Sequence, residues 1–384
     1  MSGRIFVIAG EASGDALAGD LIAALRARDA GLAFAGVGGP AMAAQGVESA
    51  IDIAPLSVLG IVEGLRAYGD VVRAADAAAE AAARFQPDAV VLVDSWGFTL
   101  RVAQRLRRLT PKAKLIKYVG PQVWATRAGR AKTLAATVDH LICIHDFEKP
   151  YYAPYGLACT VAGNPALGRV RTGDGAAFRG RHGLAPGQPV LLLAPGSRRS
   201  EIARIAPVFE TTAARLAAAR PDLQIVAVLA RGVADAARAR AARWRFPHLL
   251  VEEGEKEDAF AAATAALAAS GTVTTEIAMQ GTPVVVGYKI GWITWAIARL
   301  FLLKTRYITL MNVAAGREAA PEFVQTRMTP QRLAAALRPL LEDGAARAAQ
   351  SAAQNAALAA MGRGGRPAAE IAAGAVLDLI SAGR

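Results

Sequence analysis

The sequence predicts an α/β protein built from two doubly wound, Rossmann-like domains, each with a parallel sheet. The chain of 384 residues is longer than the size at which a single hydrophobic core usually stops growing. Short apolar runs alternate with helical patterns in its first half, and the alternation restarts after an interruption rich in Gly, Pro and Arg. An apolar share of 53% with 20% charged residues fits a globular protein and excludes a disordered or fibrous chain.

The first expected domain, residues 1–167, begins with a strand, a Gly/Ser turn and a helix. The helix follows from Leu17, Leu21, Ile22 and Leu25, which recur at the spacing of one helical face. The expected strands are Arg4–Ala9, a segment near Phe34, Ala89–Val93, Lys114–Val119 and His140–Ile144. A parallel sheet made from them binds ligands at the carboxyl ends of its strands.

The second expected domain, residues 168–345, repeats this pattern after Asn164–Gln188, which we interpret as the linker. Its strands are expected at Val190–Leu193, Gln224–Leu229, Leu249–Val251, Ala265–Ala269 and Pro283–Gly287. The Ala-rich end of the chain is helical by propensity, and residues 346–384 are expected to pack back across the domains. Two similar domains that face each other predict one deep central cleft.

The net charge of +12 favours an anionic partner, such as a phosphorylated substrate, an acidic lipid surface or nucleic acid. No run of five basic residues occurs, and no platform of basic and aromatic residues is evident. The sequence therefore does not predict nucleic-acid binding.

Cysteine content and apolar stretches bear on the compartment. Cys143 and Cys159 are too few for a disulfide framework, and no signal-peptide cleavage region precedes the first strand, which together predict a cytoplasmic protein. The apolar stretch Ile290–Leu303 is interrupted by Arg299 and is shorter than the roughly 20 residues that span a bilayer. That stretch and Leu56–Leu65 suit an acyl chain or an anionic membrane surface about as well as they suit core helices.

Two strand ends in the first domain carry candidate polar groups. Gly10–Asp15 lies between a strand and a helix, where glycines allow close backbone approach and the helix N-terminus presents free N–H groups. Ser13 and Asp15 equally suit caps of that helix. Asp94 closes an apolar strand, and a carboxylate there can deprotonate an attacking hydroxyl or cap the helix that starts near Trp96.

Two loops of the second domain have the same placement. Pro195–Arg199 follows an apolar strand and precedes a helix, so a guanidinium and free N–H groups there suit a diphosphate. A capped turn with solvated arginines is the alternative. Ala269–Thr272 offers backbone donors to phosphate, and Glu276, one helical turn further on, suits the hydroxyls of a ribose or is a solvated acid that favours the helix dipole.

Metal-dependent and triad chemistry is not expected. The chain contains no H-x-x-x-H, C-x-x-C or D-x-D pattern, which predicts metal-independent chemistry without a cofactor. Its four histidines lie singly, which does not indicate a Ser-His-Asp hydrolase. His145 and Asp146 follow a strand and are expected in a solvated loop.

Seven segments, in the same order, resemble the lipid-A-disaccharide synthases over nearly the whole chain. They are Ala9–Asp15, Gly36–Met42, Leu56–Glu63, Tyr118–Arg127, Leu193–Ile202, Ala269–Lys289 and Tyr307–Glu318. The resemblance implies the GT-B fold of glycosyltransferase family 19, in which two Rossmann-like domains face a central cleft. It implies an inverting transfer of 2,3-diacylglucosamine from UDP-2,3-diacylglucosamine to 2,3-diacylglucosamine 1-phosphate, which yields the β-1,6-linked lipid A disaccharide and UDP.

The resemblance also implies partners and site residues. Enzymes similar to this chain are peripheral at the cytoplasmic face of the inner membrane, so an anionic membrane surface is an expected partner, and a homodimer is left open. The expected catalytic residues are Asp94, as the base, with Glu11 and Arg198. Glu11 would also shape the acceptor side, with Ser13, Gly14 and Asp15. The expected donor contacts are Gly196, Ser197 and Arg198 for the diphosphate, Ser270, Gly271 and Thr272 through their backbone, and Glu276, Asn312 and Glu318 for the nucleoside or donor sugar.

Five positions depart from the family pattern: Gly120, Gln122, Thr126, Asn164 and Met311. Two other functions are open. A UDP-sugar 2-epimerase of the same fold would convert UDP-sugar without an acceptor. A basic protein without catalytic activity that binds anionic lipid would bind vesicles without releasing UDP.

Overall fold

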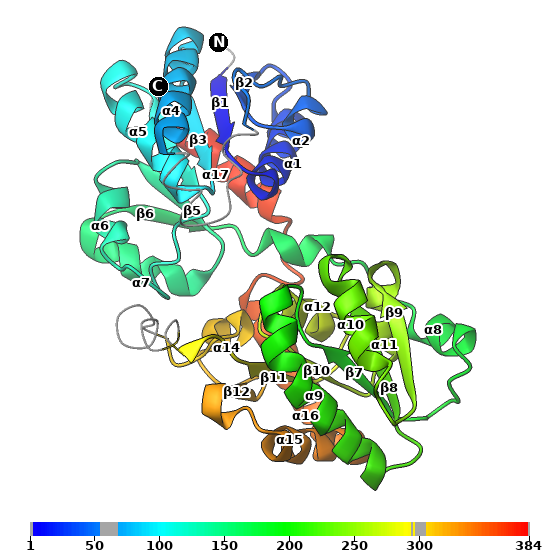
Figure 1. Ribbon diagram of the computed structural model, residues 1–384. Coiled ribbons are helices and arrows are strands. Elements are labelled where there is room, and N and C mark those ends of the chain that lie inside the picture. The colour runs from blue at the N-terminus through cyan, green and yellow to red at the C-terminus, as the bar shows by residue number, and fades with distance from the viewer. Residues whose placement is uncertain (1–2, 54–67, 293–294, 296–304, 383–384) are drawn as a thin grey trace. The chain divides into compact units, whose positions relative to one another are not determined.

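The computed structural model describes residues 3–53, 68–292, 295 and 305–382, and the chain divides into two compact units (Figure 1). Unit 1 comprises Met1–Pro165 together with Gly364–Arg384, and unit 2 comprises Ala166–Arg363. Each unit contains a six-stranded sheet in which neighbouring strands are parallel, with helices on both faces. The predicted α/β class with two doubly wound domains is therefore confirmed.

The sheet of unit 1 has the strand order β2-β1-β3-β4-β5-β6. Its strands are β1 (Arg4–Ala9), β2 (Ala33–Val37), β3 (Ala89–Val93), β4 (Lys114–Tyr118), β5 (His140–Cys143) and β6 (Ala158–Val161). Successive side chains of a strand point to opposite faces, so Ile5 and Val7 pack into one core while Phe6 and Ile8 pack into the other. Every residue of β3 is fully buried, as is typical of a central parallel strand.

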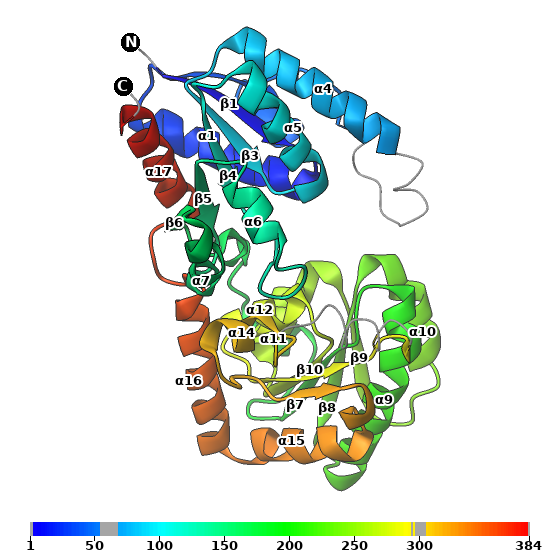
Figure 2. The same ribbon diagram turned by 90° about the vertical axis from the view of Figure 1, so that its left-hand side faces the viewer.

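Helices cover both faces of this sheet. They are α1 (Ala12–Arg28), α2 (Pro40–Ala43), α4 (Tyr68–Phe85), α5 (Trp96–Leu109), α6 (Arg130–Ala135), α7 (Lys149–Tyr152) and α17 (Ala368–Ala382). Helix α17 lies against α1 in the first core, whereas α4, α5 and α6 contribute to the second (Figure 2). The end of the chain thus completes the core of the unit that contains its beginning.

The sheet of unit 2 has the order β12-β11-β10-β7-β8-β9. Its strands are β7 (Val190–Ala194), β8 (Gln224–Leu229), β9 (His248–Glu252), β10 (Ala265–Ala268), β11 (Val284–Tyr288) and β12 (Glu322–Val324). Its helices are α8 (Gly175–Arg181), α9 (Arg199–Ala219), α10 (Ala234–Ala241), α11 (Lys256–Ala262), α12 (Thr272–Met279), α14 (Leu310–Ala315), α15 (Pro330–Glu342) and α16 (Gly344–Ala360). One core contains residues of α9 and α15, and the other contains residues of α8, α11, α12, α14 and α16.

The connection between the units is shorter than the sequence predicts. The division falls after Pro165, and within the expected linker Asn164–Gln188 the helix α8 packs against α11 of unit 2. Asp174 caps this helix and Phe178 is buried in the core. The interpretation of the whole interval as a linker was wrong because tertiary burial overrides its poor helix propensity.

The tail 346–384 is divided between the two units. Helix α16 belongs to unit 2, where Gln354 donates to the carbonyl of Thr282 and accepts from the backbone N–H of Val284. Helix α17 belongs to unit 1. Leu56–Leu65 and most of Ile290–Leu303, namely residues 293–294 and 296–303, lie outside the described residues. Among the described helices, none combines the length and the apolar character needed to cross a bilayer.

Candidate functional site

The turn that follows β3 in unit 1 is strained. Asp94 and Ser95 have φ values of 44° and 41°, the left-handed region that residues other than glycine rarely adopt. The N–H of Asp94 donates to the carbonyl of Tyr118 at 2.9 Å, and the Thr99 hydroxyl donates to the carbonyl of Asp94 at 2.8 Å and lies 3.0 Å from that of Ser95. Strain of this kind is held where the surroundings over-determine the backbone, as at active sites.

The loop Gly10–Asp15 packs onto this turn. A Cβ at Gly10 would lie 2.9 Å from Cδ1 of Phe98 and 3.0 Å from Oγ of Ser95, so only glycine fits there without a shift. A Cβ at Gly14 would lie 3.8 Å from Cβ of Asp94. Glu11 is the exposed N-cap residue of α1 in the same loop. The structure thus brings the predicted acceptor loop and Asp94 to one edge of the sheet.

Asp15 has a different environment from the rest of the loop. Its carboxylate is buried and accepts from the backbone N–H groups of Gly39, Ala41 and Met42 at 2.7 to 3.2 Å. These bonds anchor the start of α2 to α1. Asp15 therefore organises the backbone beside the loop, while Glu11 and Ser13 are exposed.

Lys117, which the sequence did not single out, lies beneath Asp94. Its side chain is only 2% exposed, and its ammonium donates to the carbonyl oxygen of Asp94 and to the hydroxyl of Thr99 at 2.8 Å. Burial lowers the pKa of Lys117 from 10.5 to about 7, and the negative charges of Asp94 and Glu11 act in the opposite direction. A lysine inside the otherwise apolar end of a strand (KLIKY) was the available signal.

In unit 2 the loop after β7 surrounds a buried carboxylate. Gly196 has φ 123°, and a Cβ there would lie 2.6 Å from Oε2 of Glu201. The N–H groups of Ser197 and Arg198 donate to that oxygen at 3.0 and 3.3 Å, and Nη1 of Arg198 donates to Oε1 at 3.0 Å. The Arg198 side chain is 75% exposed, so one end of the guanidinium is anchored while the group faces solvent.

The loop after β10 emerges beside the loop after β7. The two strands are neighbours with Ala268 opposite Ala194, and the N–H of Ala269 donates to the carbonyl of Ala194 at 2.8 Å. Ser270 to Thr272 and Gly196 to Arg198 therefore lie at the same edge of the sheet. Glu276 is not a solvated acid, because Nζ of Lys256 lies 2.6 Å from its Oε2 and both side chains are about three-quarters buried.

Asn312 and Glu318 are in contrasting positions. Asn312 is fully buried, and its four hydrogen bonds are all to groups of unit 2. Its amide nitrogen donates to the carbonyl of Ala320 and to Oε1 of Glu322, both at 2.7 Å. Its amide oxygen accepts from the N–H groups of Ala319 and Ala320 at 2.7 and 2.9 Å. Glu322 also accepts from the N–H groups of Ile308 and Thr309. This network fixes the segment that carries Glu318, whose side chain is exposed.

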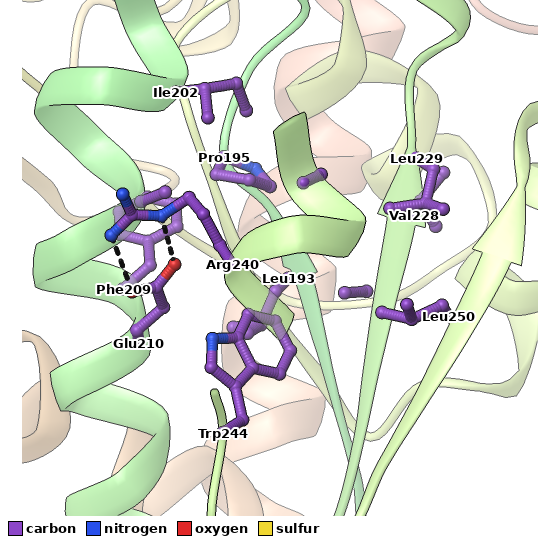
Figure 3. Close-up of a pocket in the computed structure, with 13 residues that line it drawn as sticks. Leu193, Pro195, Ile202, Phe209, Glu210, Val228, Leu229, Arg240, Trp244 and Leu250 are labelled. Carbon is purple, nitrogen blue, oxygen red and sulfur yellow. Dashed lines mark hydrogen bonds and ion pairs between the residues drawn. The ribbon is translucent and has the colours of Figure 1, made fainter. Parts of the chain in front are cut away.

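An apolar pocket lies between α9, α10 and the sheet of unit 2 (Figure 3). Leu193, Phe209 and Trp244 are among its lining residues, and the ion pair of Arg240 with Glu210, at 2.6 and 2.7 Å, lies at its side. Its apolar lining does not suit a phosphate or a nucleoside. The polar groups expected to bind a nucleotide are at the carboxyl edge of the sheet instead.

His145 is buried, contrary to the expected solvated loop. The side chain is 1% exposed and stacks on Phe147 with ring centroids 5.0 Å apart. Burial lowers its pKa to about 4, so the imidazole is neutral at physiological pH. Among the described residues no cluster of three or more His, Cys, Asp or Glu side chains could hold a metal ion.

The chain matches the family model described as Lipid-A-disaccharide synthetase over residues 5–376. It is 43% identical to the lipid-A-disaccharide synthase of Rhodospirillum centenum, covering 98% of this chain and 94% of that one. It is 42% identical to the lipid-A-disaccharide synthase of Paramagnetospirillum magneticum, covering 99% and 98%.

Solved structures with similar folds include UDP-sugar enzymes. The UDP-GlcNAc 2-epimerase of Neisseria meningitidis bound to UDP-GlcNAc superposes with a TM-score of 0.61 over 99% of this chain and all of that chain, at 12% identity. The UDP-GlcNAc 2-epimerase of Methanocaldococcus jannaschii has a TM-score of 0.56 over 89% and 93%, also at 12% identity. Likeness at that identity concerns the fold alone. The family predicted from the seven segments is confirmed by the sequence matches, and the chain belongs to the lipid-A-disaccharide synthase family, a family of glycosyltransferases.

Proposed function

We propose that this chain transfers 2,3-diacylglucosamine from UDP-2,3-diacylglucosamine to 2,3-diacylglucosamine 1-phosphate, forming the β-1,6-linked lipid A disaccharide and UDP. The observation that carries the proposal is the family match over residues 5–376. Relatives more than 40% identical over nearly the full chain bear the same name, whereas the epimerases resemble this chain only in fold.

Asp94 is the proposed base. Its carboxylate accepts the proton of the acceptor 6-hydroxyl as that oxygen attacks the anomeric carbon of the donor, and the bond from this carbon to the diphosphate breaks with inversion. The strained turn and its three backbone contacts support the assignment, since they restrict where the carboxylate can point. Glu11, Ser13 and Gly14, which lie in the loop packed on this turn, are proposed to shape the acceptor side.

Unit 2 is proposed to bind the donor. Gly196, Ser197 and the exposed guanidinium of Arg198 hold the diphosphate and stabilise the charge that develops on departing UDP. Backbone N–H groups of Ser270 to Thr272 add to this site at the adjacent strand end. The proposed contacts of the nucleoside or donor sugar are Glu276, which Lys256 orients, and Glu318.

Asp15 and Asn312 are proposed to act indirectly. Their polar atoms bond to other groups of the same unit, so they position the loops that carry Glu11 and Glu318. Peripheral attachment to an anionic inner-membrane surface at the cytoplasmic side is also a proposal, and it is supported by the net charge of +12.

The direct test is an assay of UDP release with both diacylated sugars in detergent micelles, with and without EDTA. We expect UDP and disaccharide to form in equal amounts, only when the acceptor is present, and at the same rate in EDTA. Conversion of the UDP-sugar without acceptor, followed by proton NMR, would support an epimerase instead. Vesicle binding without UDP release would support a lipid-binding protein, and loss of turnover in EDTA would refute the metal-free mechanism.

A further inference from the structure

Lys117 is a charged side chain in an apolar layer. It projects from β4 among Leu92, Trp96 and Leu134, and it is almost completely buried. Burial of an ammonium group is costly unless hydrogen bonds and nearby charge compensate it. A fully apolar side chain at this position would be expected to pack at lower cost, so the lysine calls for a specific role.

The groups that compensate the ammonium belong to the Asp94 turn. Nζ of Lys117 donates to the carbonyl oxygen of Asp94 and to the hydroxyl of Thr99, and that hydroxyl donates in turn to the same carbonyl. The three groups form a closed triangle around one backbone oxygen. Because the carbonyl belongs to a residue at φ 44°, followed by another at φ 41°, the triangle holds the backbone in a conformation that it would otherwise leave.

Two carboxylates are near enough for their negative charges to act on the ammonium. They are Asp94 at the end of β3 and Glu11 at the start of α1. The other elements packed against it contribute uncharged side chains, namely Trp96 and Thr99 of α5 and Leu134 of α6. The ammonium therefore places a positive charge near the carboxylate that we propose as the proton acceptor.

We propose that Lys117 is a positioning residue for the transfer reaction, which fixes the left-handed turn of Asp94 through its main-chain carbonyl and supplies the positive charge beneath the carboxylate. Lys117 does not touch the substrate, because its side chain is buried. The inference rests on the proposed role of Asp94 as the base. It requires the ammonium form, so turnover falls as pH rises through the lowered pKa of about 7.

The test compares three variants of the intact chain: Lys117→Met, Asp94→Asn, and Lys114→Met as a matched control. Lys114 is the first residue of β4 and is only partly buried, so the same substitution there leaves the turn untouched. We expect Lys117→Met to lower kcat by on the order of tenfold to a hundredfold, with KM for both sugars within about twofold of the wild type. The kcat of the wild type should decline above about pH 7, whereas the residual kcat of Lys117→Met should lack that decline.

The results for the variants distinguish the positioning role of Lys117 from the proposed role of Asp94 as the base. If Asp94→Asn is inactive while Lys117→Met keeps the wild-type kcat and pH profile, the positioning role is refuted and the proposed base is not. If Asp94→Asn keeps wild-type turnover, the proposed base itself fails. Should Lys117→Met fail to fold by circular dichroism, Thr99→Val replaces it, because it removes another corner of the triangle and retains the charge. An unchanged kcat in that variant also refutes the inference.

Discussion

The turn after β3 in unit 1 and the loop after β7 in unit 2 both follow a buried central strand, yet they are held by buried charges of opposite sign. Beneath Asp94 lies the ammonium of Lys117, which bonds to the backbone carbonyl of the turn. Beneath Arg198 lies the carboxylate of Glu201, which accepts from the backbone N–H groups of the loop. In each case the buried group is opposite in charge to the candidate site residue that it supports.

The difference shows how strand-end loops of the same fold can serve either proton transfer or anion binding. A turn whose carbonyl is fixed by a cation holds an acid in one backbone conformation, as a positioned proton acceptor requires. A loop whose N–H groups converge on a carboxylate presents donors and a guanidinium in one place, as an anion-binding loop requires. The backbones differ accordingly: Gly196 reaches positive φ without strain, whereas Asp94 and Ser95 reach it with strain.

Replacing Arg198 with alanine tests the anion side of the comparison. The variant loses charge-assisted hydrogen bonds to the diphosphate, so we expect donor kcat/KM to fall by on the order of a hundredfold. Acceptor KM should change little. Arg204→Ala is the control, because Arg204 is an exposed arginine on the same helix. Steady-state kinetics that show equal donor kcat/KM in both variants would contradict the role of Arg198.

The stability of Lys117→Met tests whether the buried group below Asp94 carries a positive charge. A lysine whose folded pKa lies near 7, below the ordinary 10.5, destabilises the fold below pH 7, and this cost disappears as pH rises from about 7 to 10.5. At pH 6 we expect the free energy of unfolding of the variant to be on the order of a few kcal/mol higher than that of the wild type. Urea denaturation at pH 6 and pH 9 measures this. A difference that does not shrink at pH 9 would show that the buried charge is not its cause.

Gly196→Ala is expected to have a smaller effect on stability. At φ 123° the new Cβ is strained and meets Glu201, so the free energy of unfolding should fall by about 1–3 kcal/mol and UDP affinity should weaken. Gly180→Ala is the control, because that position is helical and open space surrounds it. It should gain about 0.5–1 kcal/mol. Thermal melts that rank the two variants in the opposite order would show that the loop conformation is not constrained.

The strands that the sequence predicted were the ones with continuous apolar runs. The expected bounds of β1, β3 and β8 match the structure, and the other strands with stated bounds differ from it by one residue at one or both ends. The two missed strands, Ala158–Val161 and Glu322–Val324, are at sheet edges and are only partly buried. An edge strand packs less apolar surface than a central one, so its composition carries a weaker signal.

The sequence predicted which loops carry the candidate site. It did not predict the hydrogen-bond and ion-pair partners of the side chains in those loops. Strand-end placement located Asp94, Gly196 and Ser270. Contacts between residues distant in sequence decided which polar groups are available: Asp15 bonds to Gly39, and Lys256 pairs with Glu276. Sequence spacing carries no information about such pairs, since they are set by how strands and helices pack.

The most direct test of the proposed mechanism measures UDP affinity and turnover on one preparation of Asp94→Asn. The acid belongs to unit 1 and the proposed UDP contacts belong to unit 2. We expect a UDP dissociation constant within about twofold of the wild type by calorimetry, together with turnover lower by about a hundredfold or more. Turnover equal to that of the wild type would contradict the proposed mechanism.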